Sequence, residues 1–103
     1  MRILLVCYAG MSTGILVKKI REEAEVKGID LEIEALPWTE LDGNTNNIDI
    51  ILLGPQVRFA LDECKKMVGD QIPVVVIDSA DYGLMNGKAV LEKALRHLNP
   101  GEN

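Results

Sequence analysis

Long hydrophobic runs and concentrated positive charge are both missing from this sequence of 103 residues. No apolar run approaches the ~20 residues that a membrane-spanning helix requires, and the stretch at 2–7 is too short for a signal peptide. The net charge is −5. The one dense cationic group, at 17–21, is followed by glutamates at helical spacing, which favours a solvated helix face. We therefore expect a cytoplasmic protein without direct membrane insertion or nucleic-acid binding.

Side chains that bind metals or form disulfides are equally sparse. The chain has a single histidine, His97, and two cysteines, Cys7 and Cys64, which stand far apart. This spacing fits neither a disulfide framework nor a zinc site. Cys64 falls on an apolar helical stripe and is interpreted as core, and His97 is interpreted as a solvated group near a helix end. These residues form no cluster of metal ligands in the sequence.

Apolar runs of strand length alternate with helical stripes along the whole chain, which predicts one α/β domain over 1–103. Predicted strands cover 2–7, 29–35, 48–53 and 72–77, and the alternating pattern of the second favours a sheet edge. Helices are predicted from Ser12 or Thr13 to Gly28, from Val57 to Val68, and from Asn86 to Leu98. Residues 37–47, with one short helical turn, and 78–83 are predicted loops. The fold class is an open four-stranded parallel sheet with helices on both faces.

Three loops are predicted to meet at one edge of this sheet. Cys7, Gly54 to Gln56, and Asp78 each follow a predicted strand. In open parallel sheets the ligand site lies beyond the carboxyl ends of the strands. Cys7 is therefore interpreted as a functional residue in an exposed position rather than as a small core residue.

The segment after Cys7 combines small residues with the beginning of a helix. Unpaired backbone N–H groups and the helix dipole at such a position attract anions and stabilise a thiolate. A thiolate beside a phosphate site can accept a phosphoryl group. The position of Cys7 before a helix is compatible with other functions as well. One is a low-molecular-weight tyrosine phosphatase, whose fold is similar to the one predicted for this chain. The others are a redox enzyme and a non-enzymatic anion-binding regulatory module.

Two of these alternatives lack a residue that their chemistry needs. A phosphatase of the Cys-loop type carries an arginine six positions after the cysteine, and Thr13 stands there instead. A redox enzyme would need a resolving cysteine within reach, and no Cys-x-x-Cys motif is present.

Four collinear segments resemble the IIB components of the bacterial sugar phosphotransferase system, of the lactose, cellobiose and chitobiose type. They are "ILLVCYAGMSTGILVKKI" at 3–20, "ILLGPQVRF" at 51–59, "IPVVVID" at 72–78 and "YGLMNGKAVLEKAL" at 82–95. The resemblance implies a relay in which a phosphohistidine IIA protein phosphorylates the cysteine. The phosphocysteine then passes the group to a cellobiose-, chitobiose- or lactose-like sugar held by a membrane IIC permease.

The resemblance also implies roles for individual residues. Cys7 is the phosphoryl carrier, and the missing arginine suits a phosphocysteine that must not hydrolyse. Neither a metal nor a cofactor is required, because the donor is a phosphohistidine and the acceptor a thiolate. The phosphate-binding loop comprises Tyr8, Ala9, Gly10, Met11, Ser12 and Thr13. Tyr8 is bulkier than the small residue expected after the cysteine.

Residues on the neighbouring loops are candidates for framing this site. They are Gln56, Asp78 and Tyr82, and Asp78 is equally well interpreted as a helix cap. Trp38 is interpreted as a partly buried packing residue.

Overall fold

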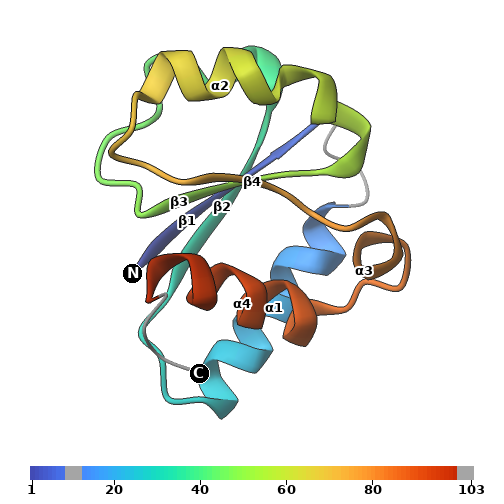
Figure 1. The fold of residues 1–103 in the computed structure, drawn as a ribbon. Helices are drawn as coiled ribbons and strands as arrows, with labels where there is room; N and C mark the ends of the chain where they lie inside the picture. The colour runs from blue at the N-terminus through green and yellow to red at the C-terminus, as the bar shows by residue number, and fades with distance from the viewer. Residues whose placement is uncertain (9–12, 100–103) are drawn as a thin grey trace.

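The computed structural model describes residues 1–8 and 13–99, which form a parallel four-stranded sheet in the order β2-β1-β3-β4 (Figure 1). Its strands are β1 (Arg2–Cys7), β2 (Glu32–Pro37), β3 (Ile50–Leu53) and β4 (Val74–Val76). The two central strands, β1 and β3, are apolar and almost entirely buried, as expected for strands covered on both faces. The predicted fold class and the predicted edge position of the second strand are confirmed.

Helices cover both faces of the sheet, as predicted. α1 (Thr13–Val26) and α4 (Gly87–Leu98) pack on one face, and α2 (Leu61–Val68) packs on the other (Figure 1). Alternate residues of β1 divide between the two cores, with Ile3 and Leu5 facing α1 and α4 and Leu4 and Val6 facing α2. Among the described residues, no helix is long and apolar enough to cross a membrane.

The ends of the main helices follow the predicted signals. α1 is followed by Gly28 in the left-handed region, at φ +69°, which a residue without Cβ adopts readily. Asn86 precedes α4, and its side-chain oxygen accepts a hydrogen bond of 3.1 Å from the Ala89 N–H. This bond satisfies one of the donors that a helix leaves unpaired at its first turn.

Several predicted boundaries are wrong. The strands predicted at 48–53 and 72–77 are shorter, at Ile50–Leu53 and Val74–Val76. Residues 78–83 are not a loop but contain the short helix α3 (Ser79–Gly83). The second strand begins at Glu32 and continues to Pro37, beyond the predicted end at residue 35. The second predicted helix is two elements that begin earlier than expected, the 3₁₀ helix η2 (Pro55–Ala60), which is kinked at Val57, and α2. The segment 37–47 contains the short 3₁₀ helix η1 (Trp38–Glu40), which follows Pro37 and has no side-chain cap.

Candidate functional site

Cys7 is the last residue of β1, at the carboxyl edge of the sheet, where it is paired with Pro37 of β2. Its Sγ lies 3.4 Å from the carbonyl oxygen of Leu36 and donates a hydrogen bond to it. The residue is only 2% exposed. The expectation of an exposed cysteine is therefore wrong, because this side chain is buried and its thiol contacts the carbonyl of Leu36.

The segment that follows Cys7 is only partly described. Tyr8 is exposed, and Thr13, the first residue of α1, is the one polar residue among the buried side chains of the described chain. Ala9, Gly10, Met11 and Ser12 lie outside the described residues. The predicted phosphate-binding loop can thus be placed only at its two ends, which connect the end of β1 to the beginning of α1.

The electrostatic surroundings of Cys7 differ from those of the chain as a whole. The sequence has no Asp or Glu before Glu22, although the net charge is −5. The first turn of α1 carries no acidic residue. The segment that leaves β3 is also free of acids from Ile50 to Leu61, and it carries Arg58. An anion arriving at these two helix beginnings therefore meets no carboxylate from either segment.

Gln56 and Tyr82 come together at the end of β3, beside β1. The Gly54 N–H donates a 2.8 Å hydrogen bond to the Val6 carbonyl. A Cβ at Gly54 would lie 3.1 Å from Gln56 Oε1, 3.5 Å from the Val6 oxygen and 3.6 Å from Tyr82 Cε2. Tyr82 is buried and Gln56 is exposed. Two of the three candidate framing residues are thus within reach of the strand that ends in Cys7.

Asp78 has a different environment. Its Oδ1 accepts a 2.9 Å hydrogen bond from the Ala80 N–H at the beginning of α3. This contact is the helix cap that was the alternative interpretation of this residue. α3 in turn places Tyr82 in the core beneath the sheet edge, and Lys93 of α4 forms an ion pair of 2.6 Å with Asp81 of α3.

Sequence analysis missed the aromatic contact beside this site. Trp38, half-buried as expected, meets the exposed Phe59 edge to face, with ring centroids 5.5 Å apart. Phe59 lies in η2, where its neighbours Val57 and Ala60 are buried. The apolar stripe of the predicted helix includes Val57 and Ala60 but not Phe59. This pattern indicates that the Phe59 side chain is exposed, and it was the available sequence signal.

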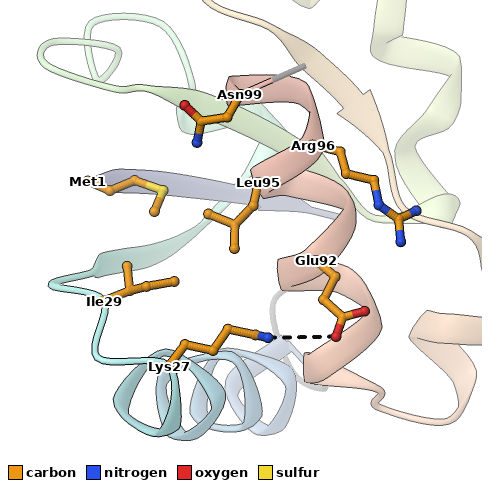
Figure 2. A pocket seen from close by; sticks show the side chains of 7 residues that line it. All are labelled: Met1, Lys27, Ile29, Glu92, Leu95, Arg96 and Asn99. Atoms are coloured by element: carbon orange, nitrogen blue, oxygen red, sulfur yellow. Dashed lines mark ion pairs between the residues drawn. The ribbon is translucent and has the colours of Figure 1, made fainter. Parts of the chain in front are cut away.

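A groove of about 590 Å³ lies at the opposite edge of the sheet (Figure 2). Met1, Ile29 and Leu95 provide its apolar surface, and Lys27 and Glu92 form an ion pair of 3.7 Å across it. Met1 and Ile29 precede β1 and β2, so the groove opens at the amino ends of these strands. It contains none of the predicted site residues.

Comparisons with known proteins agree with the sequence resemblance. Residues 2–93 match the family model described as PTS system, Lactose/Cellobiose specific IIB subunit. The chain is 39% identical to the oligo-beta-mannoside-specific EIIB component of Bacillus subtilis (strain 168), over 91% of this chain and 92% of that protein. It is 40% identical to the cellobiose-specific EIIB component of Lactococcus lactis subsp. lactis (strain IL1403), over 94% and 95%.

Solved structures show the same arrangement of the chain. The cellobiose-specific phosphotransferase IIB component from Borrelia burgdorferi superposes with a TM-score of 0.79 at 42% identity, covering 97% of this chain and 93% of that one. The lactose-specific IIB component domain from Streptococcus pneumoniae gives a TM-score of 0.77 at 21% identity, covering 94% and 96%. The second likeness concerns the fold alone.

Proposed function

The chain belongs to the lactose/cellobiose-specific IIB family of the phosphotransferase system, and we propose that Cys7 is its phosphoryl carrier. In this proposal Cys7 accepts the group from a phosphohistidine on a IIA protein. It then passes the group to a sugar held by a membrane IIC permease, at the cytoplasmic face. The observation that carries the proposal is the position of Cys7, at the carboxyl end of a central strand and directly before the segment that enters α1.

The chemistry consists of two displacements at phosphorus. The Cys7 thiol loses its proton to solvent, and the thiolate attacks the phosphorus of the phosphohistidine. The S–P bond forms while the N–P bond breaks, and the imidazole keeps the electron pair and takes up a proton. In the second displacement a sugar hydroxyl attacks the phosphorus. The S–P bond breaks, the sulfur keeps the electron pair, and the hydroxyl proton is released.

The surrounding residues have supporting roles in this proposal. Tyr8 to Thr13 bind the phosphoryl oxygens through backbone N–H groups at the beginning of α1. Gln56 and Tyr82 frame the site, as their contacts around Gly54 support. Asp78 acts indirectly, because its carboxylate caps the helix that carries Tyr82.

The proposed sugar is a cellobiose-, chitobiose- or lactose-like substrate selected by the membrane partner. Relatives of nearly equal identity are named for different sugars. At 40% identity these include a galactose-specific EIIB component of Lactococcus lactis subsp. cremoris (strain MG1363), over 94% of this chain and 95% of that protein. Relatives that are similar in sequence but named for different sugars are expected if the carrier presents the phosphoryl group without itself contacting most of the sugar.

Intact-mass spectrometry tests the proposal directly. The protein is incubated with a phosphoenolpyruvate-driven relay that ends in a IIA component of the cellobiose type. We expect one phosphoryl group per chain. Cys7→Ser should abolish it, because an un-ionised hydroxyl is a far weaker nucleophile than a thiolate at neutral pH.

The matched control is Cys64→Ser, which should retain full labelling because Cys64 lies on the buried side of α2, in the core that α2 covers. Burying a hydroxyl there costs about 1 to 3 kcal/mol of stability, so folding is verified by circular dichroism. Labelling that survives Cys7→Ser and is lost in folded Cys64→Ser would refute the assignment.

A further inference from the structure

Asn86 and Gly87 form the only Asn-Gly pair in the sequence, and they stand at the beginning of α4. An asparagine side chain can react with the backbone nitrogen of the next residue. This nitrogen loses its proton to a base and attacks Cγ, a succinimide ring closes, and the amide group leaves as ammonia with a proton from solvent. Water then opens the ring at either carbonyl, which gives aspartate or isoaspartate. Glycine after the asparagine favours the reaction, because it has no side chain to hinder the attack.

The fold holds both reacting groups of this pair. Asn86 Oδ1 accepts a 3.1 Å hydrogen bond from the Ala89 N–H, and the Gly87 N–H donates a 3.0 Å hydrogen bond to the Met85 carbonyl. Water and base reach the exposed side chain of Asn86, whereas Gly87 is buried against α1. The Gly87 nitrogen must give up its proton and turn towards Cγ, which these contacts prevent. The reaction therefore requires the first turn of α4 to open.

The segment that leads into this turn is suited to local opening. Met85 lies in the left-handed region, at φ +51°, which a residue with a Cβ adopts only at an energetic cost. Leu84, directly before it, is 78% exposed and so contributes little buried apolar area. Segments with few buried contacts open more often than the whole chain unfolds. The pair is thus protected by a turn that is less stable than the two cores.

The two products affect the fold differently. An aspartate at position 86 still offers an oxygen to the Ala89 N–H, and its negative charge is favourable at the beginning of a helix. In isoaspartate the main chain runs through the former side chain and is longer by a CH₂ group. The carbonyl that accepts the Val90 N–H at 3.1 Å becomes a free carboxylate. Gly87 has no space to move towards α1, because a Cβ there would collide with the Lys19 backbone, and a move away from α1 loses the contact.

We propose that Asn86 is a deamidation site controlled by the first turn of α4. The side chain is stable while it caps the helix and reacts when this turn opens. The isoaspartate product cannot restore the contact between α4 and α1, whereas the aspartate product can. This inference is independent of the phosphoryl-transfer function.

Peptide mass spectrometry of chains incubated in mildly alkaline buffer tests the protection. Deamidation at position 86 is followed over time in the folded wild type and in the same chain unfolded in guanidinium chloride, with an unincubated sample as background. We expect the rate in the folded chain to be at least about tenfold lower. Equal rates in the two states would overturn the proposal.

A matched pair of variants distinguishes local opening from unfolding of the whole chain. Lys88→Gly weakens the first turn of α4 and should raise the folded-state rate about three- to fivefold, because glycine disfavours helix. Lys65→Gly makes the same change at an exposed lysine of α2, and its rate should stay within twofold of the wild type. The rate of each variant in guanidinium chloride corrects for the intrinsic effect of the sequence. Equal acceleration in both variants would overturn control by the first turn of α4.

The fate of the products is tested on wild-type chains that have been deamidated in guanidinium chloride and then refolded. The refolded mixture is placed in increasing concentrations of urea, unfolded chains are removed by a short pulse of protease, and the intact chains are analysed. Chains with isoaspartate at position 86 should disappear at lower urea concentrations than chains with aspartate, for which Asn86→Asp is the reference. Loss of both products at the same urea concentration would overturn the inference that isoaspartate breaks the contact between α4 and α1.

Discussion

Cys7 and Cys64 are almost equally buried, at 2% and 3% exposure, but their surroundings favour different chemistry. Cys7 ends a strand and donates a hydrogen bond to the Leu36 carbonyl. Cys64, a residue of α2, packs among the apolar side chains of the core that α2 covers. Burial raises the pKa of the Cys64 thiol above its ordinary value of 9.0, and the Glu63 carboxylate raises it further. Cys64 is thus held in its neutral, unreactive form.

The raised pKa of Cys64 predicts a loss of stability at alkaline pH. The unfolded chain releases this proton at a lower pH than the folded chain does. The contribution of Cys64 to the free energy of unfolding is therefore complete below about pH 9 and is lost as the pH rises through the raised pKa. Urea titrations measure the free energy of unfolding at each pH. Above about pH 9 this free energy should fall more steeply for the wild type than for Cys64→Ala, by up to about 1.4 kcal/mol per pH unit.

The slope, rather than the absolute stability, is the relevant quantity in this comparison. Cys64→Ala also leaves a small cavity, which lowers stability by a similar amount at every pH. Parallel curves for the two proteins between pH 7 and about pH 10 would show that ionisation of Cys64 has no influence on folding.

At the scale of elements, the contact between α1 and α4 depends on one glycine. Asn86 caps α4, and Gly87, its first residue, is buried against α1. A Cβ at Gly87 would lie 2.5 Å from the Lys19 carbonyl carbon and 2.7 Å from the Ile20 nitrogen. These are backbone atoms, which cannot move aside as a flexible side chain can. Only glycine allows the beginning of α4 to approach α1 this closely.

We predict that Gly87→Ala lowers the free energy of unfolding by about 1 to 3 kcal/mol, the usual cost of overpacking. Gly14→Ala is the matched control, because Gly14 is also helical and a Cβ there has no atom within 4 Å. Its stability should be unchanged or slightly higher, since alanine favours helix more than glycine does. Equal stability of the two variants in urea unfolding would contradict the close packing of α1 and α4.

At the scale of the whole molecule, the proposed phosphoryl transfer predicts little hydrolysis of small phosphate esters. Thr13 stands where a phosphatase has its arginine, and Cys7 is buried. We expect negligible turnover of p-nitrophenyl phosphate, because the charge clamp that stabilises the transition state of ester hydrolysis is missing. Release of nitrophenolate is followed by absorbance, with Cys7→Ser as the background. Robust turnover that depends on Cys7 would instead support a phosphatase.

Much of this molecule follows from local sequence patterns. The apolar run at 2–7 predicts β1 at its observed bounds, and Gly28 and Asn86 mark helix ends by their own chemistry. Two features depend on tertiary contacts instead. α3 is too short for a hydrophobic period to reveal it. The end of β2 at Pro37 depends on pairing with β1, and the burial of Cys7 is likewise a tertiary property. The approach of Gly87 to α1 has no sequence signal at all.

The central position of β1 has a consequence for the order in which the chain can fold during synthesis. β1 leaves the ribosome first, but Ile3 pairs with Ile33 on one side and with Ile50 on the other. A nascent chain that ends before β3 can complete α1 and pair β1 with β2, yet one edge of its most apolar strand stays open. The segment that becomes the centre of the sheet is thus the one that depends longest on residues not yet translated.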